Sequence, residues 1–292
     1  MTETATAARL DAAFADAGVT GWLHAVDIDS GAQTGTGADQ PVCTASVHKV
    51  CVLVTLHELA AAGSLDLTEQ VECPPAGRTP GPTGLAAMLD PVRLSLRDAA
   101  FLMMSVSDNT AADLLLRRVG RDAVNRTTAR LGLTRTRMAC GFGEMLATMR
   151  EDAGPAGARA LADPHVIARL RALDPARTNR GTPRDMTRLL GALWRDETCP
   201  PEYGAAMRRI MGLQVWPHRL ASGFPFDDVH VAGKTGTLPT LRNEVGVVEY
   251  PDGGRYAVAV FTRTANPAAT LPAADAVIGT AARIAVDALR AP

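Results

Sequence analysis

Apolar residues recur at helical spacing through the middle of the chain and at strand spacing near both of its ends. Residues 3–17 form an amphipathic pattern that predicts a helix, which Gly18 ends. Residues 21–29 mix apolar and polar positions in alternation and predict a strand, and residues 30–32 (Ser-Gly-Ala) form a turn into a second strand. The chain is therefore predicted to open with a helix and a β-hairpin.

The segment 46–212 carries almost only helical signal. Five helices are predicted in it, at residues 47–62, 95–104, 110–119, 122–131 and 182–196. Ser95 with Asp98 three residues later resembles a capping box, and Thr182 places a cap before Pro183 at the first helical position. These helices are expected to pack on one another.

The pattern returns to strands after Gly223. Strands are predicted at 229–237, 243–250 and 255–263, and an Ala-rich helix at about 268–289. Strands thus come from both ends of the chain, with the helical segment inserted between them. This order predicts an α/β fold, in which a mostly antiparallel sheet is flanked by the terminal helices and joined to an inserted all-α domain.

The same order predicts the domain boundaries. We expect residues 1–43 and 219–292 to form a discontinuous α/β domain and residues 44–218 to form the all-α domain. An active site is expected in the cleft between the two domains.

Composition excludes several classes of function. The 292 residues carry a net charge of -1, which gives no electrostatic reason to expect a nucleic acid or an anionic membrane as partner. The apolar runs fall far short of the roughly 20 residues that cross a bilayer. The first twenty residues do not resemble a signal peptide, so a cytoplasmic location is expected. Five scattered cysteines and the absence of metal-ligand spacing predict neither a metal nor another cofactor.

Lys49 and Lys234 are the two lysines among 30 basic residues. Since lysine can lose its proton when buried, whereas arginine does not, both are candidates for proton chemistry. Ser46 precedes Lys49 by three residues, a spacing that puts both side chains on one face of a helix. A neutral lysine there could take the proton of a nucleophilic serine. The alternative is a capping serine beside a surface lysine.

Two further polar clusters carry candidate chemistry. Ser107, Asp108 and Asn109 lie in a turn between predicted helices and offer a hydroxyl, a carboxylate and an amide. The alternative is a capping turn with Asn109 as the cap. Residues 234–237 (Lys-Thr-Gly-Thr) end a predicted strand, where Gly236 allows close backbone approach. Here the alternative is merely an edge strand.

The motifs Ser-x-x-Lys, Ser-Asp-Asn and Lys-Thr-Gly, in this order, are the signature set of class A β-lactamases and penicillin-binding proteins. The stretches MSVSDNTAADLLLRRVG, NRGTPRDMTRLL, RLASGFP and HVAGKTGT also resemble that family. The chain therefore resembles the class A serine β-lactamase superfamily over roughly residues 20–290. The resemblance implies the class A β-lactamase-like two-domain fold and a mechanism through an acyl-enzyme.

The resemblance also implies catalytic roles. Ser46 would become acylated, Lys49 would be its general base, and Ser107 would pass a proton to the leaving group. Lys234 would lie near Ser107 and favour that proton transfer. The backbone N–H groups of Ser46 and Thr237 would form the oxyanion hole.

Substrate-binding positions follow from the same resemblance: Asn109, Thr235, Gly236, Thr237, Arg219 and Arg242. Asn109 would hold Lys49 and a substrate amide, and the two threonines would meet a substrate carboxylate or amide. Either arginine would bind a substrate carboxylate, the alternative for each being an ordinary surface position.

The chain departs from the family at the deacylation base. Family hydrolases place a glutamate about 17 residues before the proline of the Thr-Pro helix, and this count from Pro183 reaches Val166. The nearest carboxylates are Glu144, Glu151, Asp163 and Asp174. The base is therefore predicted to be absent, and Asp163 could replace it only in a rebuilt loop. His48, where the family usually has an apolar or aromatic residue, is expected to be a packing residue, and segment 79–89 lacks the family's aromatic rim residue.

An acylation site without a hydrolytic base would form an acyl-enzyme that water attacks slowly. We therefore expect an intracellular acyltransferase (transacylase), or an ester or amide hydrolase, of small-molecule or antibiotic metabolism. Its partners would be a small acyl donor (an ester, amide or β-lactam) and an amine acceptor. The alternatives are a β-lactamase with a displaced base and a non-enzymatic sensor that binds penicillin or another acylating ligand.

Overall fold

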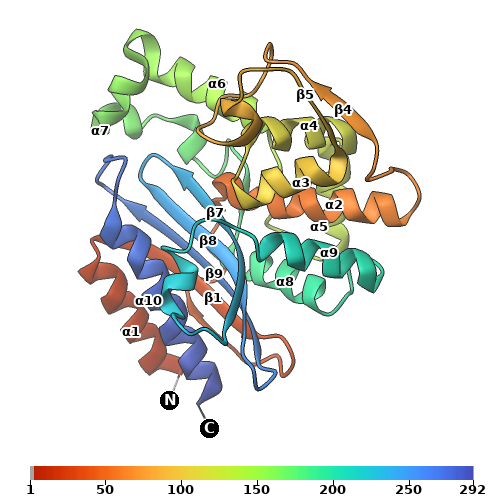
Figure 1. Ribbon diagram of the computed structural model, residues 1–292. Coiled ribbons are helices and arrows are strands. Elements are labelled where there is room, and N and C mark those ends of the chain that lie inside the picture. Colours follow the sequence, from red (N-terminus) through yellow and green to blue (C-terminus); the bar gives the residue numbers. More distant parts are fainter. Residues whose placement is uncertain (1–2, 292) are drawn as a thin grey trace.

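A five-stranded antiparallel sheet lies at the centre of the computed structural model, which describes residues 3–291 (Figure 1). Its strands, in the spatial order β2-β1-β9-β8-β7, are β1 (Val19–Asp27), β2 (Gln33–Thr36), β7 (His230–Leu238), β8 (Leu241–Glu249) and β9 (Arg255–Thr264). Leu23 of β1 pairs with Val260 of β9, so the two ends of the chain meet inside the sheet. Strand β7 forms one edge of the sheet.

Helices cover both faces of the sheet. On one face α1 (Glu3–Asp16) and α10 (Pro272–Arg290) pack side by side (Figure 1). Leu10 and Phe14 of α1 are buried there among the apolar residues of the sheet. The opposite face packs against α8 (Pro183–Trp194). Burial on both faces explains the continuous apolar run of β9 from Tyr256 to Phe261.

The helical part lies on the side of the sheet where β7 forms the edge (Figure 1). Its α-helices, besides α8, are α2 (Lys49–Ala61), α3 (Leu96–Ser105), α4 (Asn109–Val119), α5 (Arg121–Arg130), α6 (Phe142–Ala153), α7 (Pro164–Ile167) and α9 (Pro201–Met211). Short 3₁₀ turns lie at Ala45–His48, Gly84–Ala87, Gly154–Ala162, Arg171–Leu173 and Leu220–Gly223. Helix α2 is buried along most of its length and contacts α3, α4, α5 and α9. The 3₁₀ turn before α2 packs against β7, which fixes the distance between the helical part and the sheet.

The predicted helix caps are confirmed. Ser95 Oγ accepts a hydrogen bond from the backbone N–H of Asp98 at 3.2 Å. Thr182 Oγ1 accepts one from the backbone N–H of Asp185 at 3.0 Å, directly before the proline that begins α8. Each side chain satisfies an N–H group that the first turn of a helix leaves unpaired. The other predicted elements are also present, with ends that differ by a few residues.

Three expectations about the elements are wrong. The α-helix expected from residue 47 begins at Lys49, because a 3₁₀ turn precedes it. The last helix begins at Pro272 and not near residue 268, since proline suits the first turn of a helix. The middle of the chain is not almost purely helical: β3 (Val42–Cys43) pairs with β6 (Arg180–Gly181), and β4 (Gln70–Cys73) pairs with β5 (Val92–Ser95). These strands are too short for an alternating pattern to reveal them.

Within residues 3–291 no helix has the length and apolar character needed to cross a membrane. The same residues contain no cluster of His, Cys, Asp and Glu suited to a metal ion, and the five cysteines are free thiols. The domain boundaries at residues 43/44 and 218/219 stay a prediction.

Candidate active site

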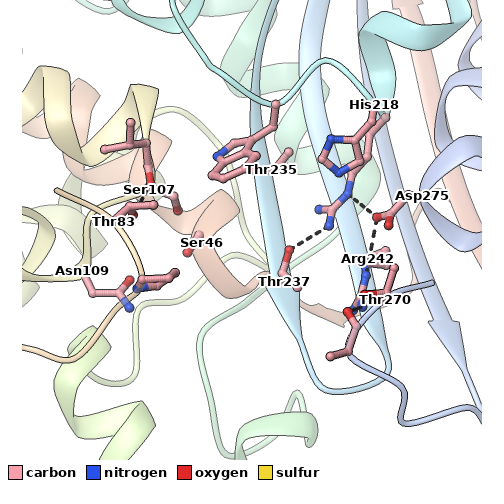
Figure 2. A pocket seen from close by; sticks show the side chains of 15 residues that line it. Ser46, Thr83, Ser107, Asn109, His218, Thr235, Thr237, Arg242, Thr270 and Asp275 are labelled. Carbon is pink, nitrogen blue, oxygen red and sulfur yellow. Dashed lines mark hydrogen bonds and ion pairs between the residues drawn. The ribbon is translucent and has the colours of Figure 1, made fainter. Parts of the chain in front are cut away.

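A cavity of about 490 Å³ lies where the helical part meets strand β7. Figure 2 shows Ser46, Ser107 and Asn109 on its helical side, across from Thr235 and Thr237 on the strand. The predicted site residues that line this cavity are Ser46, Ser107, Asn109, Thr235, Thr237, Arg219 and Arg242. Lys49, Lys234 and Gly236 lie directly beneath this lining, in contact with it. The structure thus brings all the predicted site residues together.

Ser46 lies in the 3₁₀ turn that precedes α2. Its neighbour Ala45 has a φ of 49°, a left-handed conformation that costs a non-glycine residue energy and is held by the surrounding structure. Gly236 of β7 packs directly against this turn, because a Cβ at Gly236 would stand 2.7 Å from the carbonyl oxygen of Thr44. Glycine is therefore required at this position if the strand is to approach the nucleophile closely.

Lys49 is fully buried beside Ser46. Its Nζ donates to the carbonyl oxygen of Ser107 at 2.7 Å and to Asn109 Oδ1 at 2.8 Å, and lies 3.3 Å from Ser107 Oγ. None of these three contacts of Nζ is with Ser46. Burial lowers the pKa of Lys49 from its ordinary value of 10.5 to about 7, although two nearby carboxylates raise it. A large share of Lys49 is therefore an unprotonated amine at neutral pH, as a general base must be.

Ser107 Oγ stands between two lysine amines. Lys234 Nζ donates to it at 3.0 Å and to the carbonyl oxygen of Thr235 at 2.8 Å, while Lys49 lies on its other side. Burial, and then the positive charge of Lys49, lower the pKa of Lys234 well below its ordinary value. Ser107 also has a left-handed φ of 58°. Its hydroxyl is placed to move a proton between the two amines and the cavity.

Asp108, and not Asn109, caps α4. Asp108 Oδ1 accepts hydrogen bonds from two backbone N–H groups of the first turn, at 2.9 and 3.2 Å, so the interpretation of Asn109 as a cap is wrong. Asn109 is instead the first residue of the helix. Its Oδ1 holds Lys49, as the resemblance implied, and its Nδ2 donates to the carbonyl oxygen of Pro80 at 2.9 Å.

The free edge of β7 faces the cavity. The backbone N–H of Thr235 donates to Gln214 Oε1 at 2.6 Å, outside the sheet. Because alternate residues of a strand direct their N–H groups to the same edge, the N–H of Thr237 also points away from β8. The N–H of Thr237 therefore faces the same side as Ser46, where an oxyanion hole requires it.

The chain matches the model of the "Beta-lactamase enzyme family" over residues 5–289. It belongs to the β-lactamase enzyme family. A relative from Streptomyces cacaoi, described as beta-lactamase regulatory protein BlaB, is 35% identical, and the match covers 94% of each chain. The structure of a β-lactamase from Sphaerobacter thermophilus has 27% identity and a TM-score of 0.81 over 100% of both chains. PBP-A, at 22% identity, has the same fold with a TM-score of 0.80, over 98% of this chain and 96% of its own.

These findings confirm the class A serine β-lactamase and penicillin-binding protein superfamily and its α/β fold. The chain is thus a β-lactamase-family protein of the serine type. Its cavity also contains features that the sequence did not reveal.

Two buried arginines of this β-lactamase-family protein share one carboxylate. Asp275 Oδ1 lies 2.7 Å from Arg219 Nε and 3.5 Å from Arg242 Nε, and Arg219 Nη2 donates to Thr237 Oγ1 at 2.9 Å (Figure 2). With exposed fractions of 5% and 3%, neither arginine is an ordinary surface residue. Both line the cavity, and Asp275 cancels one of their two positive charges.

The carboxylates considered as deacylation bases make local contacts away from the cavity: Glu144, Glu151, Asp163 and Asp174. Val166, which the count from Pro183 indicated, lies in α7 and does not line the cavity either. Within residues 3–291 the carboxylate that lines it is Asp275, which the two arginines hold. Next to Lys49 lies the ring of Phe142, with its centre 4.8 Å from Nζ.

Several residues at the site carried no signal in the sequence. Trp216 and His218 line the cavity with their ring centres 6.3 Å apart in an edge-to-face contact, and provide the aromatic rim that segment 79–89 lacks. Glu244 is fully buried behind Lys234 and accepts hydrogen bonds from Gln214 Nε2 at 2.6 Å and from the backbone of the 3₁₀ turn at 220–223. Burial raises the pKa of Glu244 to about 7. No motif contains these residues, so only tertiary packing could reveal them.

His48 is the last residue of the 3₁₀ turn that carries Ser46, and it is fully buried. Its Nδ1 lies 3.3 Å from Thr44 Oγ1. Burial lowers the pKa of His48 to about 4, so the ring is neutral near pH 7. This environment agrees with the packing role expected for it.

Proposed function

We propose that this protein is an acyl-transferring serine enzyme in which Ser46 accepts the acyl group of a small ester, amide or β-lactam. One observation carries the proposal: an array of Lys49, Ser107 and Lys234 lies beside Ser46, whereas the cavity offers, among residues 3–291, no free carboxylate to activate water. The first half of this observation supports acylation. The second half supports slow hydrolysis.

Acylation would use the groups in their observed places. Neutral Lys49 takes the proton of Ser46, whose Oγ bonds to the carbonyl carbon of the donor. The N–H groups of Ser46 and Thr237 stabilise the oxyanion. As the bond to the leaving group breaks, Ser107 donates its proton to that group and regains one from the lysine amines beside it.

The acyl group would then pass to an amine. An unprotonated amine attacks without first losing a proton, whereas water needs a base to attack at a comparable rate, so the missing carboxylate slows hydrolysis more than aminolysis. The amine nitrogen bonds to the carbonyl carbon, the bond to Ser46 Oγ breaks, and one N–H proton passes through Lys49 and Ser107 to Ser46 Oγ. Trp216 and His218, whose rings meet edge to face, line the cavity, and a ring face there is a surface on which an acceptor can stack. The acceptor is therefore proposed to be a small amine.

A second candidate function is an acylation sensor. The observation that favours it is the relative from Streptomyces cacaoi, which is described as a regulatory protein. In a sensor the adduct itself is the signal, and it would persist whether or not an amine is present. A hydrolysing β-lactamase is the third candidate, since other family members carry that description.

Intact-protein mass spectrometry with penicillin G and with p-nitrophenyl acetate separates these candidates. Wild type is expected to gain the mass of the acyl group, Ser46→Ala is not, and Ser64→Ala, which changes an exposed serine, is expected to behave as wild type. An adduct that glycylglycine discharges supports the acyltransferase, and one that persists with it supports the sensor. Fast return to the unmodified mass in water alone supports the hydrolase. Acylation of Ser46→Ala at the wild-type rate would refute the whole assignment.

The cytoplasmic location expected from the first twenty residues remains a prediction. Compartment fractionation of the native cells with an antibody against the protein would test it.

A further inference from the structure

The amine of Lys49 is covered on one side by an aromatic ring. Its polar partners among the described residues are the backbone and hydroxyl oxygens of Ser107 and the amide oxygen of Asn109. The face of Phe142 lies over the amine, with its centre 4.8 Å from Nζ, and Phe142 is itself fully buried. A phenyl ring excludes water and offers no lone pair to orient it.

The ring is held there by the first turn of α6. The backbone N–H groups of Phe142 and Gly143 donate to Asp113 Oδ1 and Oδ2 at 2.8 and 2.7 Å. Asp113 is nearly buried on α4, one turn after Asn109, and Thr79 Oγ1 also donates to it at 2.6 Å. The carboxylate therefore ties the start of α6 to the helix that begins with a site residue.

The glycines on both sides of Phe142 make this contact possible. A Cβ at Gly143 would stand 2.9 Å from Asp113 Oδ2, and one at Gly141 would stand 3.2 Å from Asp113 Oδ1. A side chain at Gly143 would force Asp113 or the turn to shift, and one at Gly141 would crowd the same carboxylate, so both glycines favour the contact that holds the ring beside Lys49. The sequence Gly-Phe-Gly thus fixes an apolar group where the chain could have carried a polar one.

We propose that Phe142 determines the reaction specificity of the site: it keeps water and any base away from Lys49 and so protects the acyl group on Ser46 from hydrolysis. This inference rests on the proposed function. Hydrolysis requires that a water oxygen bond to the ester carbonyl carbon, that one water proton move to a base, and that Ser46 Oγ leave with a proton, which releases the free acid. The ring occupies the place beside Lys49 from which such a base would act.

Replacement of Phe142 tests this role through the lifetime of the adduct. Phe142→Glu places a carboxylate beside Lys49 and is expected to shorten the lifetime of the penicillin G adduct about a hundredfold, since general bases contribute factors of this order. Phe142→Gln admits water without a strong base and is expected to shorten it about tenfold, and Phe142→Leu keeps the side apolar and is expected to leave it unchanged. Phe101→Glu makes the same exchange at a half-exposed position of α3 and serves as the matched control.

Adduct formation and loss are followed separately by mass spectrometry without an amine, on variants whose folding is checked by circular dichroism. For Phe142→Glu the loss is also measured against pH, because a carboxylate base makes it rise as that group ionises, which a merely loosened structure would not. If Phe142→Glu does not fold, a shorter lifetime for Phe142→Gln than for Phe142→Leu still supports the inference. Acylation at the wild-type rate with equal lifetimes in all folded variants would overturn this inference alone. Absence of any adduct on wild type would overturn the proposed function and this inference with it.

Discussion

The buried amine of Lys49 predicts how acylation depends on pH. With a pKa of about 7, the unprotonated fraction of Lys49 is about one tenth at pH 6 and about nine tenths at pH 8. The acylation rate is therefore expected to rise about tenfold over this interval and to level off above pH 8. An ordinary lysine would be less than about 1% unprotonated at pH 8, and the rate would go on rising about tenfold per pH unit.

Stopped-flow mixing with a chromogenic cephalosporin measures the rate of acylation from pH 5.5 to 9.5. Samples quenched at the same times are checked for the adduct by mass spectrometry. Glu244 has a raised pKa in the same range, so Glu244→Gln is the control, and it is expected to keep the midpoint near pH 7. Lys49→Arg keeps the positive charge but removes the base, and its rate is expected to be at least about a hundredfold lower throughout. A wild-type rate that increases without levelling up to pH 9.5 would refute the argument that burial makes Lys49 the base.

Three further predictions follow from contacts near the cavity. Gly236→Ala places a Cβ against the carbonyl oxygen of Thr44, so β7 must move away from Ser46. The acylation rate measured by stopped-flow mixing is expected to fall at least about tenfold, and an unchanged rate would contradict the close approach of β7 to the turn that carries Ser46. Glu244→Gln leaves the donors of Gln214 and Leu220 with a single side-chain oxygen to accept their hydrogen bonds. The free energy of unfolding in urea denaturation is expected to fall by about 1–3 kcal/mol, and no loss would mean that the carboxylate is not needed there. Asp275→Asn removes the negative charge that offsets Arg219 and Arg242. The acylation rate with penicillin G, which carries a carboxylate, is therefore expected to rise relative to the rate with p-nitrophenyl acetate. An unaltered ratio of the two rates would contradict a carboxylate-binding site at these arginines.

Local sequence patterns account for much of the fold. Ser95 and Thr182 cap the helices that they were expected to cap, because capping depends on the few residues around each position. The short strands β4 and β5 were missed, since four residues are too few to show a period of two and these strands form only through their pairing.

The chemistry of the site was predictable where it follows a motif. Ser46, Ser107 and Lys234 come from distant parts of the sequence, yet each stands at a turn or strand edge that the fold brings to one cavity. Phe142 and Asp275 were not predictable. Their importance comes from tertiary contacts with Lys49 and with two arginines, and neither residue type nor spacing indicates such contacts.

The pairing of β1 with β9 has a consequence for how the protein is made. Leu23 and Val260 are neighbours in the sheet, but more than two hundred residues separate them along the chain. At a synthesis rate of about 5–20 residues per second, the first strand waits for tens of seconds before its partner leaves the ribosome. Throughout that interval helix α1 and strand β1 have only β2 beside them, because the other three strands of the sheet are not yet made. A truncated nascent chain is therefore expected to hold its helical part collapsed while its first 36 residues remain open to chaperones and proteases.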